Sequence, residues 1–235
     1  MKTIIIISAM ATFFLTIDLV SFGQGKSATP LKFTAGILTG YNKGYGLKGN
    51  ITARNFEKEF PFQLRFGLGY TFLNPGDAAD ARRIFINNAT NGTPEKKGRS
   101  FDLRLDFMIP RSIFNVEDSY LVIGPRFSTF MGDFKYVGGN EDFEVKSNQW
   151  GIGSDIEHHL RMMKNIEFVL NYGLDLYVPA TLTGHDTSYS PGNDNVNPKN
   201  DNQNDNIEFI YKDADKAINQ PKIMPHIMIG VNFNL

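Results

Sequence analysis

The chain has 235 residues and a net charge of −1, from 24 basic and 25 acidic side chains. This balance gives no support to a nucleic-acid partner, which usually requires a basic surface. There is no cysteine, so neither a disulfide bond nor a cysteine-linked lipid anchor is available. With 20 Phe and 9 Tyr in the chain, the aromatic content needs a structural explanation.

The first 24 residues have the pattern of a cleaved secretory signal peptide. Lys2 gives a positive start, and an apolar run from Thr3 to Val20 contains one charged residue, Asp18. Small residues follow from Ser21 onward. The interrupted run is shorter than the roughly 20 residues of a membrane-spanning helix, so we expect cleavage within Gly23–Lys26 rather than an uncleaved anchor.

Eight later segments alternate between apolar and polar side chains, which is the pattern of a β-strand with two different faces. The predicted strands are Leu31–Tyr41, Tyr45–Phe56, Phe60–Phe72, Ser100–Ile109, Tyr120–Met131, Gln149–Met162, Glu167–Leu176 and Ile223–Leu235. In the third strand every second residue from Phe60 to Phe72 is Phe, Leu or Tyr. Its length of about 13 residues exceeds the roughly 5 to 6 of an average strand, and it suffices for the roughly 9 to 11 that cross a bilayer at a tilt.

The connections alternate between short and long. Short links are expected at Glu57–Glu59, Arg111–Ser119 and Met163–Asn165, and the tight turn Asn42–Gly44 is the shortest outer loop. Long breaks are expected at Asn74–Gly98, with a helical turn around Ala78–Ile86, at Gly132–Asn148 and at Thr181–Pro221. Bacterial barrels place short turns in the periplasm and long loops outside, and this order satisfies that rule.

The predicted fold is therefore all-β, an eight-stranded antiparallel up-and-down transmembrane β-barrel over residues 25–235. Bilayer hydrocarbon offers no water to an open sheet edge, so the last strand must pair with the first. Two aromatic girdles are expected, with Tyr41, Tyr45, Tyr70, Phe72 and Trp150 near the loops and Phe56, Phe60, Phe107 and Phe233 near the turns. A soluble lipocalin-like barrel is the alternative, but it would place these apolar faces inside.

The chain resembles the small eight-stranded outer-membrane barrels of the OmpA/OmpX type, the outer membrane protein β-barrel group. The matching features are the signal-peptide pattern, the eight alternating segments and the terminal stretch Ile229–Leu235. In that family the barrel-assembly machinery reads alternating terminal residues, and the resemblance assigns this role to Val231, Phe233 and Leu235. Leu235 departs from the commoner terminal Phe. The resemblance implies a multi-pass protein of the Gram-negative outer membrane, with outer-membrane lipid and the assembly machinery as partners.

The inward faces carry seven basic and six acidic side chains. They are Lys32, Lys48, Arg54, Arg65, Asp102, Arg104, Asp106, Arg126, Asp155, Glu157, Arg161, Glu167 and Asp175. An eight-stranded barrel is just wide enough for side chains to fill it, and buried charges are tolerated when they are paired. The sequence therefore predicts an internal salt-bridge network, with His159 as a member, that plugs the lumen. A narrow porin-like pore for small solutes or ions is the alternative.

No catalytic residue is expected. Ser154 and His158 both face outward on the sixth strand, while Glu157 faces the interior. Four residues along a strand separate side chains by about 13 Å, which is too far for a nucleophile and its base. His158 also lies toward the periplasmic turn. An outer-membrane lipid-modifying enzyme of the lipid A deacylase type is nevertheless kept as the second alternative.

No metal or cofactor is expected either. Residues Asn193–Asn206 hold seven Asn and three Asp, and such a composition favours a mobile, solvated loop. Calcium is the alternative ligand, but Asp194, Asp201 and Asp205 do not have the spacing of a known calcium loop.

The prediction from sequence is thus a non-enzymatic, monomeric outer-membrane barrel. It would serve envelope structure or surface interaction through its three long loops, and the sequence leaves the surface ligand open.

Overall fold

The computed structural model describes residues 31–55, 62–86, 92–139, 141–201 and 204–235. The predicted signal peptide at 1–24 lies outside these residues, as do Phe56 and Phe60 of the predicted girdle. Within the described ranges, no helix combines the length and the apolar character that a membrane crossing demands.

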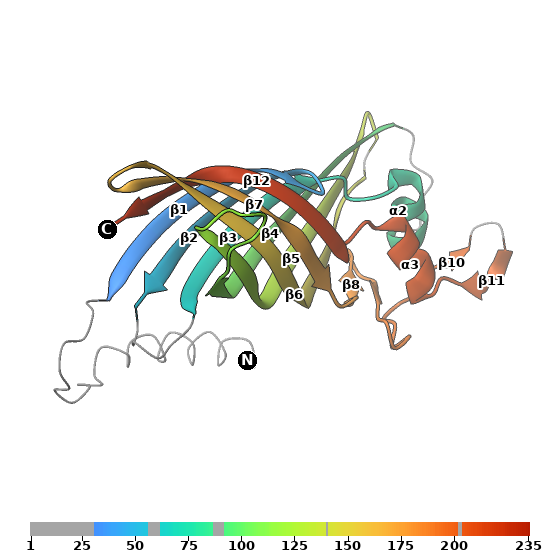
Figure 1. Cartoon of the computed structure of the whole chain (residues 1–235). Coiled ribbons are helices and arrows are strands. Elements are labelled where there is room, and N and C mark those ends of the chain that lie inside the picture. Colours follow the sequence, from blue (N-terminus) through green and yellow to red (C-terminus); the bar gives the residue numbers. More distant parts are fainter. Residues whose placement is uncertain (1–30, 56–61, 87–91, 140, 202–203) are drawn as a thin grey trace. The chain divides into compact units, whose positions relative to one another are not determined.

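Eight long strands form a closed barrel (Figure 1). They are β1 (Lys32–Asn42), β2 (Tyr45–Arg54), β3 (Gln63–Leu73), β4 (Thr93–Pro110), β5 (Ser119–Val137), β6 (Asp142–Met163), β7 (Ile166–Tyr177) and β12 (Ile223–Asn234). Each strand is antiparallel to its neighbours. The last strand, β12, pairs with β1 from Thr34↔Asn234 to Asn42↔His226. The predicted fold class and the predicted closure are therefore confirmed.

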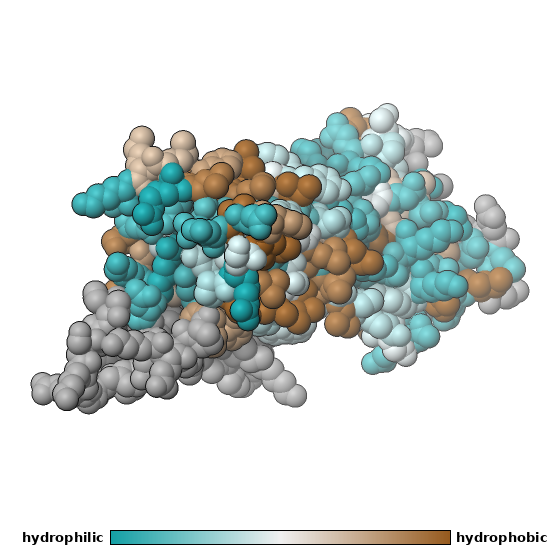
Figure 2. Space-filling view, in the orientation of Figure 1, coloured by the Kyte–Doolittle hydropathy of each residue, from teal (hydrophilic) through white to brown (hydrophobic). Residues whose placement is uncertain are grey.

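The two faces of the barrel wall differ in polarity as the alternation predicts. Apolar side chains are exposed along the outside, including Tyr41, Tyr45, Phe72 and Trp150 near the loops and Phe107 and Phe233 near the turns. Figure 2 shows the hydrophobic residues gathered over the strands, while hydrophilic residues dominate the end that carries the helices. The interior is largely polar, so the soluble-barrel alternative does not describe this chain.

Three strands are longer than predicted. β4 begins at Thr93 rather than Ser100, β5 continues to Val137, and β6 begins at Asp142. Most of the expected loop Gly132–Asn148 is therefore a hairpin between β5 and β6. Of the expected loop Asn74–Gly98, only Thr93–Gly98 belongs to a barrel strand. In the extensions of β5 and β6 the inner face becomes apolar, at Phe134, Tyr136, Phe143 and Val145, so the polar-in, apolar-out alternation is lost there. The extension of β4 is instead charged and mostly exposed.

The loops carry two helices and four short strands. These elements are α2 (Ala78–Phe85), β8 (Leu182–Thr183), β9 (Ser188–Tyr189), β10 (Asn200–Asp201), β11 (Asn204–Glu208) and α3 (Tyr211–Ala217). The helical turn expected at Ala78–Ile86 is thus confirmed. Asp77 caps α2, because its carboxylate accepts a hydrogen bond from the Asp80 amide at 2.9 Å.

These loop elements and the strand extensions share one hydrophobic core, which we call the cap core. It comprises Ala78, Ala81, Ile84 and Phe85 with Phe130, Phe134, Tyr136, Phe143, Val145, Leu182, Tyr189, Phe209, Ala214, Ala217 and Ile218. The rings of Phe85 and Tyr189 meet edge to face at 5.4 Å, and the Tyr136 hydroxyl donates to the Ala78 carbonyl at 2.8 Å.

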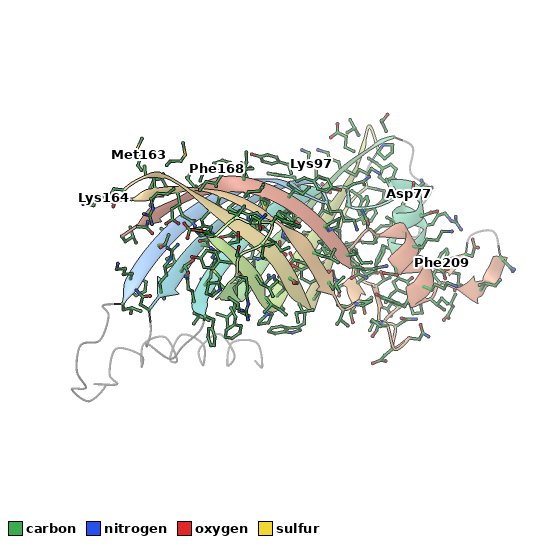
Figure 3. All side chains as sticks on the ribbon, in the orientation of Figure 1. Asp77, Lys97, Met163, Lys164, Phe168 and Phe209 are labelled. Carbon is green, nitrogen blue, oxygen red and sulfur yellow. The ribbon has the colours of Figure 1, made fainter. Side chains whose placement is uncertain are left out.

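The long break Thr181–Pro221 contributes buried residues on both sides of its Asn-rich middle. Leu182, Tyr189 and Phe209 from these flanks are buried in the cap core. The Asn-rich middle fits the expectation of a solvated loop, since residues 193–201 are exposed or half-buried. Their mobility stays a prediction. Figure 3 places Met163 and Lys164 at the turn end of the barrel, and Asp77 and Phe209 at the opposite, loop end.

We expect Phe85→Ala to disorder the cap without opening the barrel. The substitution removes a fully buried ring, which costs about 3–5 kcal/mol, whereas the barrel hydrogen bonds do not involve it. Limited proteolysis of the refolded protein should cut the loops at least ~10-fold faster, while a heat-modifiability gel still reports a folded barrel. The exposed Ile207→Ala serves as the control; equal protection of both variants would contradict a shared cap core.

Candidate functional site: the charged barrel interior

Ionisable side chains from seven of the barrel strands lie in the interior and fall into two clusters. The central cluster consists of Arg104, Asp106, Arg126, Asp155, Asp175 and His226. The turn-end cluster consists of Arg54, Arg65, Glu157, His159 and Glu167. Both arise because the inner positions of the strands alternate with the lipid-facing ones.

Two arginines organise the central cluster. Arg104 donates to Asp175 at 2.7 Å and to Asp155 at 2.9 Å. Arg126 donates to Asp175 at 2.9 Å and to Asp106 at 2.5 Å. Each guanidinium therefore joins two carboxylates, a geometry that its planar set of donors allows. Both arginines and all three carboxylates are buried.

His226 completes the central cluster. Its Nε2 lies 3.0 Å from Asp155 and its Nδ1 lies 3.7 Å from Asp175. Sequence reasoning missed this residue, although a signal existed. On β12, Met224, His226 and Met228 occupy every second position opposite the exposed Ile227 and are buried.

The turn-end cluster is a chain of alternating charges. Arg65 binds Glu157 through two hydrogen bonds of 2.7 Å. His159 lies between two carboxylates, with Nε2 at 2.6 Å from Glu157 and Nδ1 at 2.9 Å from Glu167. Arg54 reaches Glu167 at 3.3 Å. A neutral imidazole donates from one nitrogen only, so both carboxylates receive a hydrogen bond only when His159 is doubly protonated.

Glycine on the inner face makes room for the arginines. A Cβ at Gly153 would lie 2.1 Å from a carboxylate oxygen of Asp175 and 2.4 Å from a guanidinium nitrogen of Arg126. No side chain fits at that distance. The absence of a side chain at this position therefore allows the ion pair to cross the barrel.

The structure places the predicted interior residues unevenly. Lys48 and Asp102 are buried beside the central cluster; Asp102 accepts a hydrogen bond from the Tyr177 hydroxyl at 3.3 Å. The prediction that Lys32 and Arg161 belong to the interior network is wrong, because both side chains are exposed at the turn end of the barrel. At the last positions of a strand the wall no longer surrounds an inward side chain, so long basic residues extend into water.

The interior contains a small cavity. The cavity between the two clusters has a volume of about 20 Å³ and is lined by Lys48, Arg65, Arg104 and Glu157 among others. That volume suits about one water molecule. The Lys48 ammonium is buried without a hydrogen-bond partner among the described residues, and such a water would satisfy it.

The interior also contains a group with metal-binding residue types. Donor atoms of Asp155, Asp175 and His226 lie within 4.8 Å of one another. The group fits a cation poorly, because Arg104 and Arg126 already donate to its carboxylates. In the Asn-rich loop, Asp201 forms an ion pair with Arg83 at 3.2 Å, and calcium binding there stays an untested alternative.

On the outer wall, the arrangement around His158 differs from the expected one. His158 is buried, and its Nδ1 lies 2.7 Å from the hydroxyl of Ser119 rather than beside Ser154. The Tyr172 hydroxyl lies 3.0 Å from Nε2. The Ser119 hydroxyl donates to the Val116 carbonyl at 2.8 Å, so it accepts from the histidine. Such a serine is held as a structural bridge and is not activated as a nucleophile.

Comparison with known proteins supports the fold. No protein-family model and no curated protein matches the chain. A major outer membrane protein from Thermus thermophilus is similar in structure, with a TM-score of 0.68 at 20% identity over 88% of this chain and 100% of that one. Neisserial surface protein A (NspA) has a TM-score of 0.38 at 12% identity, over 90% of this chain and 100% of its own. CarO from Acinetobacter baumannii has a TM-score of 0.38 at 16% identity, over 89% of this chain and 100% of its own. The latter two are too distant to support an argument.

The fold and the surface together define the class of protein. A closed eight-stranded barrel with an apolar outer wall, a polar interior, short turns at one end and long loops at the other is an outer-membrane β-barrel. The narrower relationship to the OmpA/OmpX type stays a prediction, as does the role of Val231, Phe233 and Leu235 in assembly.

Arg126→Ala should destabilise the barrel strongly. It leaves the buried carboxylates of Asp106, Asp155 and Asp175 with fewer partners, and an uncompensated buried charge costs about 3–5 kcal/mol. Urea unfolding of the protein in lipid vesicles measures the loss. Arg161→Ala, which removes the same group from an exposed position, should change the free energy of unfolding by less than about 0.5 kcal/mol. Similar losses in both variants would contradict the network.

Proposed function

We propose that this protein is a closed, non-conducting and non-enzymatic outer-membrane barrel that holds an ordered extracellular cap for surface interaction. The observation that carries the proposal is that two separate features, the interior charges and the cap core, close the lumen. Paired charges fill the barrel down to a cavity of about 20 Å³, and the cap core covers the loop end above them.

An ion that crossed the barrel would have to separate the central cluster. Arg104 and Arg126 each hold two carboxylates, and Asp175 is bonded to both. Removing one partner from such a buried group costs several kcal/mol, which is far more than thermal energy supplies. The clusters are also anchored on opposite strands, so they resist displacement. The geometry therefore favours a plugged lumen and does not favour a narrow conducting pore.

The absence of enzymatic activity rests on two placements. Ser154 lies on the outer face of β6, where it pairs with Leu174 and Ile123 on the neighbouring strands. The serine that contacts His158 is Ser119, which is buried and donates to a backbone carbonyl. Neither serine is both accessible and paired with a base, as nucleophilic catalysis requires.

The cap supplies the candidate interaction surface. Tertiary contacts organise it: Arg83 pairs with Asp201 at 3.2 Å, and the Lys199 amide donates to the Tyr189 hydroxyl at 3.0 Å. Exposed aliphatic side chains lie on it at Val196, Ile207 and Ile210. An ordered surface with apolar contacts binds a partner at a lower entropic cost than a disordered loop does.

Single-channel recording tests the closed lumen. The refolded protein in a planar bilayer should show no conductance steps, because ion pairs cross the lumen in both clusters. A heat-modifiability gel on the same preparation establishes that the barrel is folded. Steady openings of the folded protein would refute the plug and make the pore the better description.

Complementation separates a role of the cap from a role of the barrel. In cells that lack the protein, wild type and Phe85→Ala are compared for surface adhesion and for outer-membrane uptake of a hydrophobic dye. We expect Phe85→Ala to behave like the deletion in adhesion, because the cap core supports the surface. Full rescue of adhesion by this variant, at equal surface abundance, would show that the cap does not act as an interaction surface.

A further inference from the structure

A basic pocket lies outside the barrel, at the loop end. Its volume is about 510 Å³, and its charged lining residues are Lys43, Lys216, Lys222 and Asp215. Three ammonium groups face one carboxylate, which leaves an excess of two positive charges. A volume of this size is typical of small-molecule sites.

Backbone hydrogen bonds between two loop segments hold the base of the pocket in place. The pocket lies where residues Asn74–Gly76 meet the end of α3, and Gly76 forms a β-bridge with Ile218. The Asn219 amide donates to the Pro75 carbonyl at 2.8 Å, and the Asp77 amide donates to the Ala217 carbonyl at 2.8 Å. These backbone bonds tie the cap to the barrel rim, so the pocket is a fixed feature of the fold.

The ammonium groups are only partly neutralised. Lys222 forms an ion pair with Asp215 at 2.5 Å, whereas Lys43 has a neutral partner, the Asn219 side-chain oxygen, at 3.2 Å. Burial and the nearby ammonium of Lys222 lower the pKa of Lys43. An anion between the two lysines would relieve this repulsion.

The pocket lies beside the lipid-facing wall. Lys43 is in the β1–β2 turn, between Tyr41 and Tyr45, which are exposed on the outside. Ile223 lines the pocket and is exposed, and Ile227, opposite Tyr41 on β12, continues the apolar wall. Tyrosine side chains favour the membrane–water interface. The short β1–β2 turn therefore places the pocket at the height of the headgroups of the extracellular leaflet.

From this juxtaposition we propose that the pocket binds the phosphorylated headgroup of a glycolipid in the outer leaflet. Lys43, Lys216 and Lys222 bind the phosphate, and the acyl chains lie along the wall formed by Tyr41, Ile223 and Ile227. A phosphate monoester carries a charge of about −1.5 to −2 at neutral pH, which matches the excess charge of the lysines. The adjoining apolar wall favours a lipid over a soluble anion. This inference is independent of whether the cap binds a surface partner.

Native mass spectrometry of the full-length, detergent-solubilised protein tests the proposal. The probes are diphosphoryl lipid A and the same lipid with both phosphates removed. Because three lysines line the pocket and pair with the phosphates, wild type should prefer the phosphorylated lipid by at least ~10-fold. The variant K43Q/K216Q/K222Q should lose that preference.

The control variant K97Q/K135Q/K212Q removes the same charge from exposed positions outside the pocket lining and should retain the preference. Asp215→Asn, which frees Lys222, should strengthen binding by about fivefold. Lys216→Gln, an exposed change on α3, should weaken it by about fivefold and does not depend on how the triple variant folds.

Three outcomes would overturn the proposal. The two lipids could bind equally well, the triple pocket variant could match wild type, or inorganic phosphate could occupy the pocket while the protein shows no preference between the lipids. The last result would identify a site for a free anion rather than for a lipid.

Discussion

The pairing of β12 with β1 is the constraint on which the rest of this structure depends. A sheet in hydrocarbon cannot leave an edge of unpaired amide and carbonyl groups, and the register from Thr34↔Asn234 to Asn42↔His226 removes that edge. Closure then separates two environments. The outer face contacts lipid and becomes apolar, and the inner face is enclosed in a space just wide enough for side chains.

Enclosure determines the chemistry of the interior. Charged side chains on opposite walls cannot avoid one another at this diameter, so they remain ionised only as pairs. Arg104 and Arg126 satisfy this condition by spanning to Asp155, Asp175 and Asp106, and Gly153 leaves the space for them. The same compactness that stabilises the charges leaves a cavity of about 20 Å³. Barrel size together with charge pairing thus supports the proposal of a closed lumen.

Under the proposal of a closed lumen, function lies at the loop end, which offers two different surfaces. The cap core joins loops that are far apart in sequence, through contacts such as Phe85 with Tyr189. Where the cap meets the low rim at the β1–β2 turn, it forms the basic pocket around Lys43 and Lys222. We propose the first surface as the site of surface interaction and the second as a site for a lipid headgroup. A closed barrel that supports both is consistent with a role at the cell surface.

The sequence by itself determined the barrel. The alternation in segments such as Phe60–Phe72 is a local pattern, because a lipid-facing wall requires an apolar side chain at every second residue. The number of strands, the closure of the barrel and most of the interior charges could therefore be predicted. Only the tertiary structure decided the cap core, the Ser119–His158 contact, the exposure of Lys32 and Arg161, and the basic pocket. The cap core, the Ser119–His158 contact and the pocket depend on residues from different strands or loops that approach one another, and the exposure of Lys32 and Arg161 depends on where the barrel wall ends. No periodicity within one segment records such an approach.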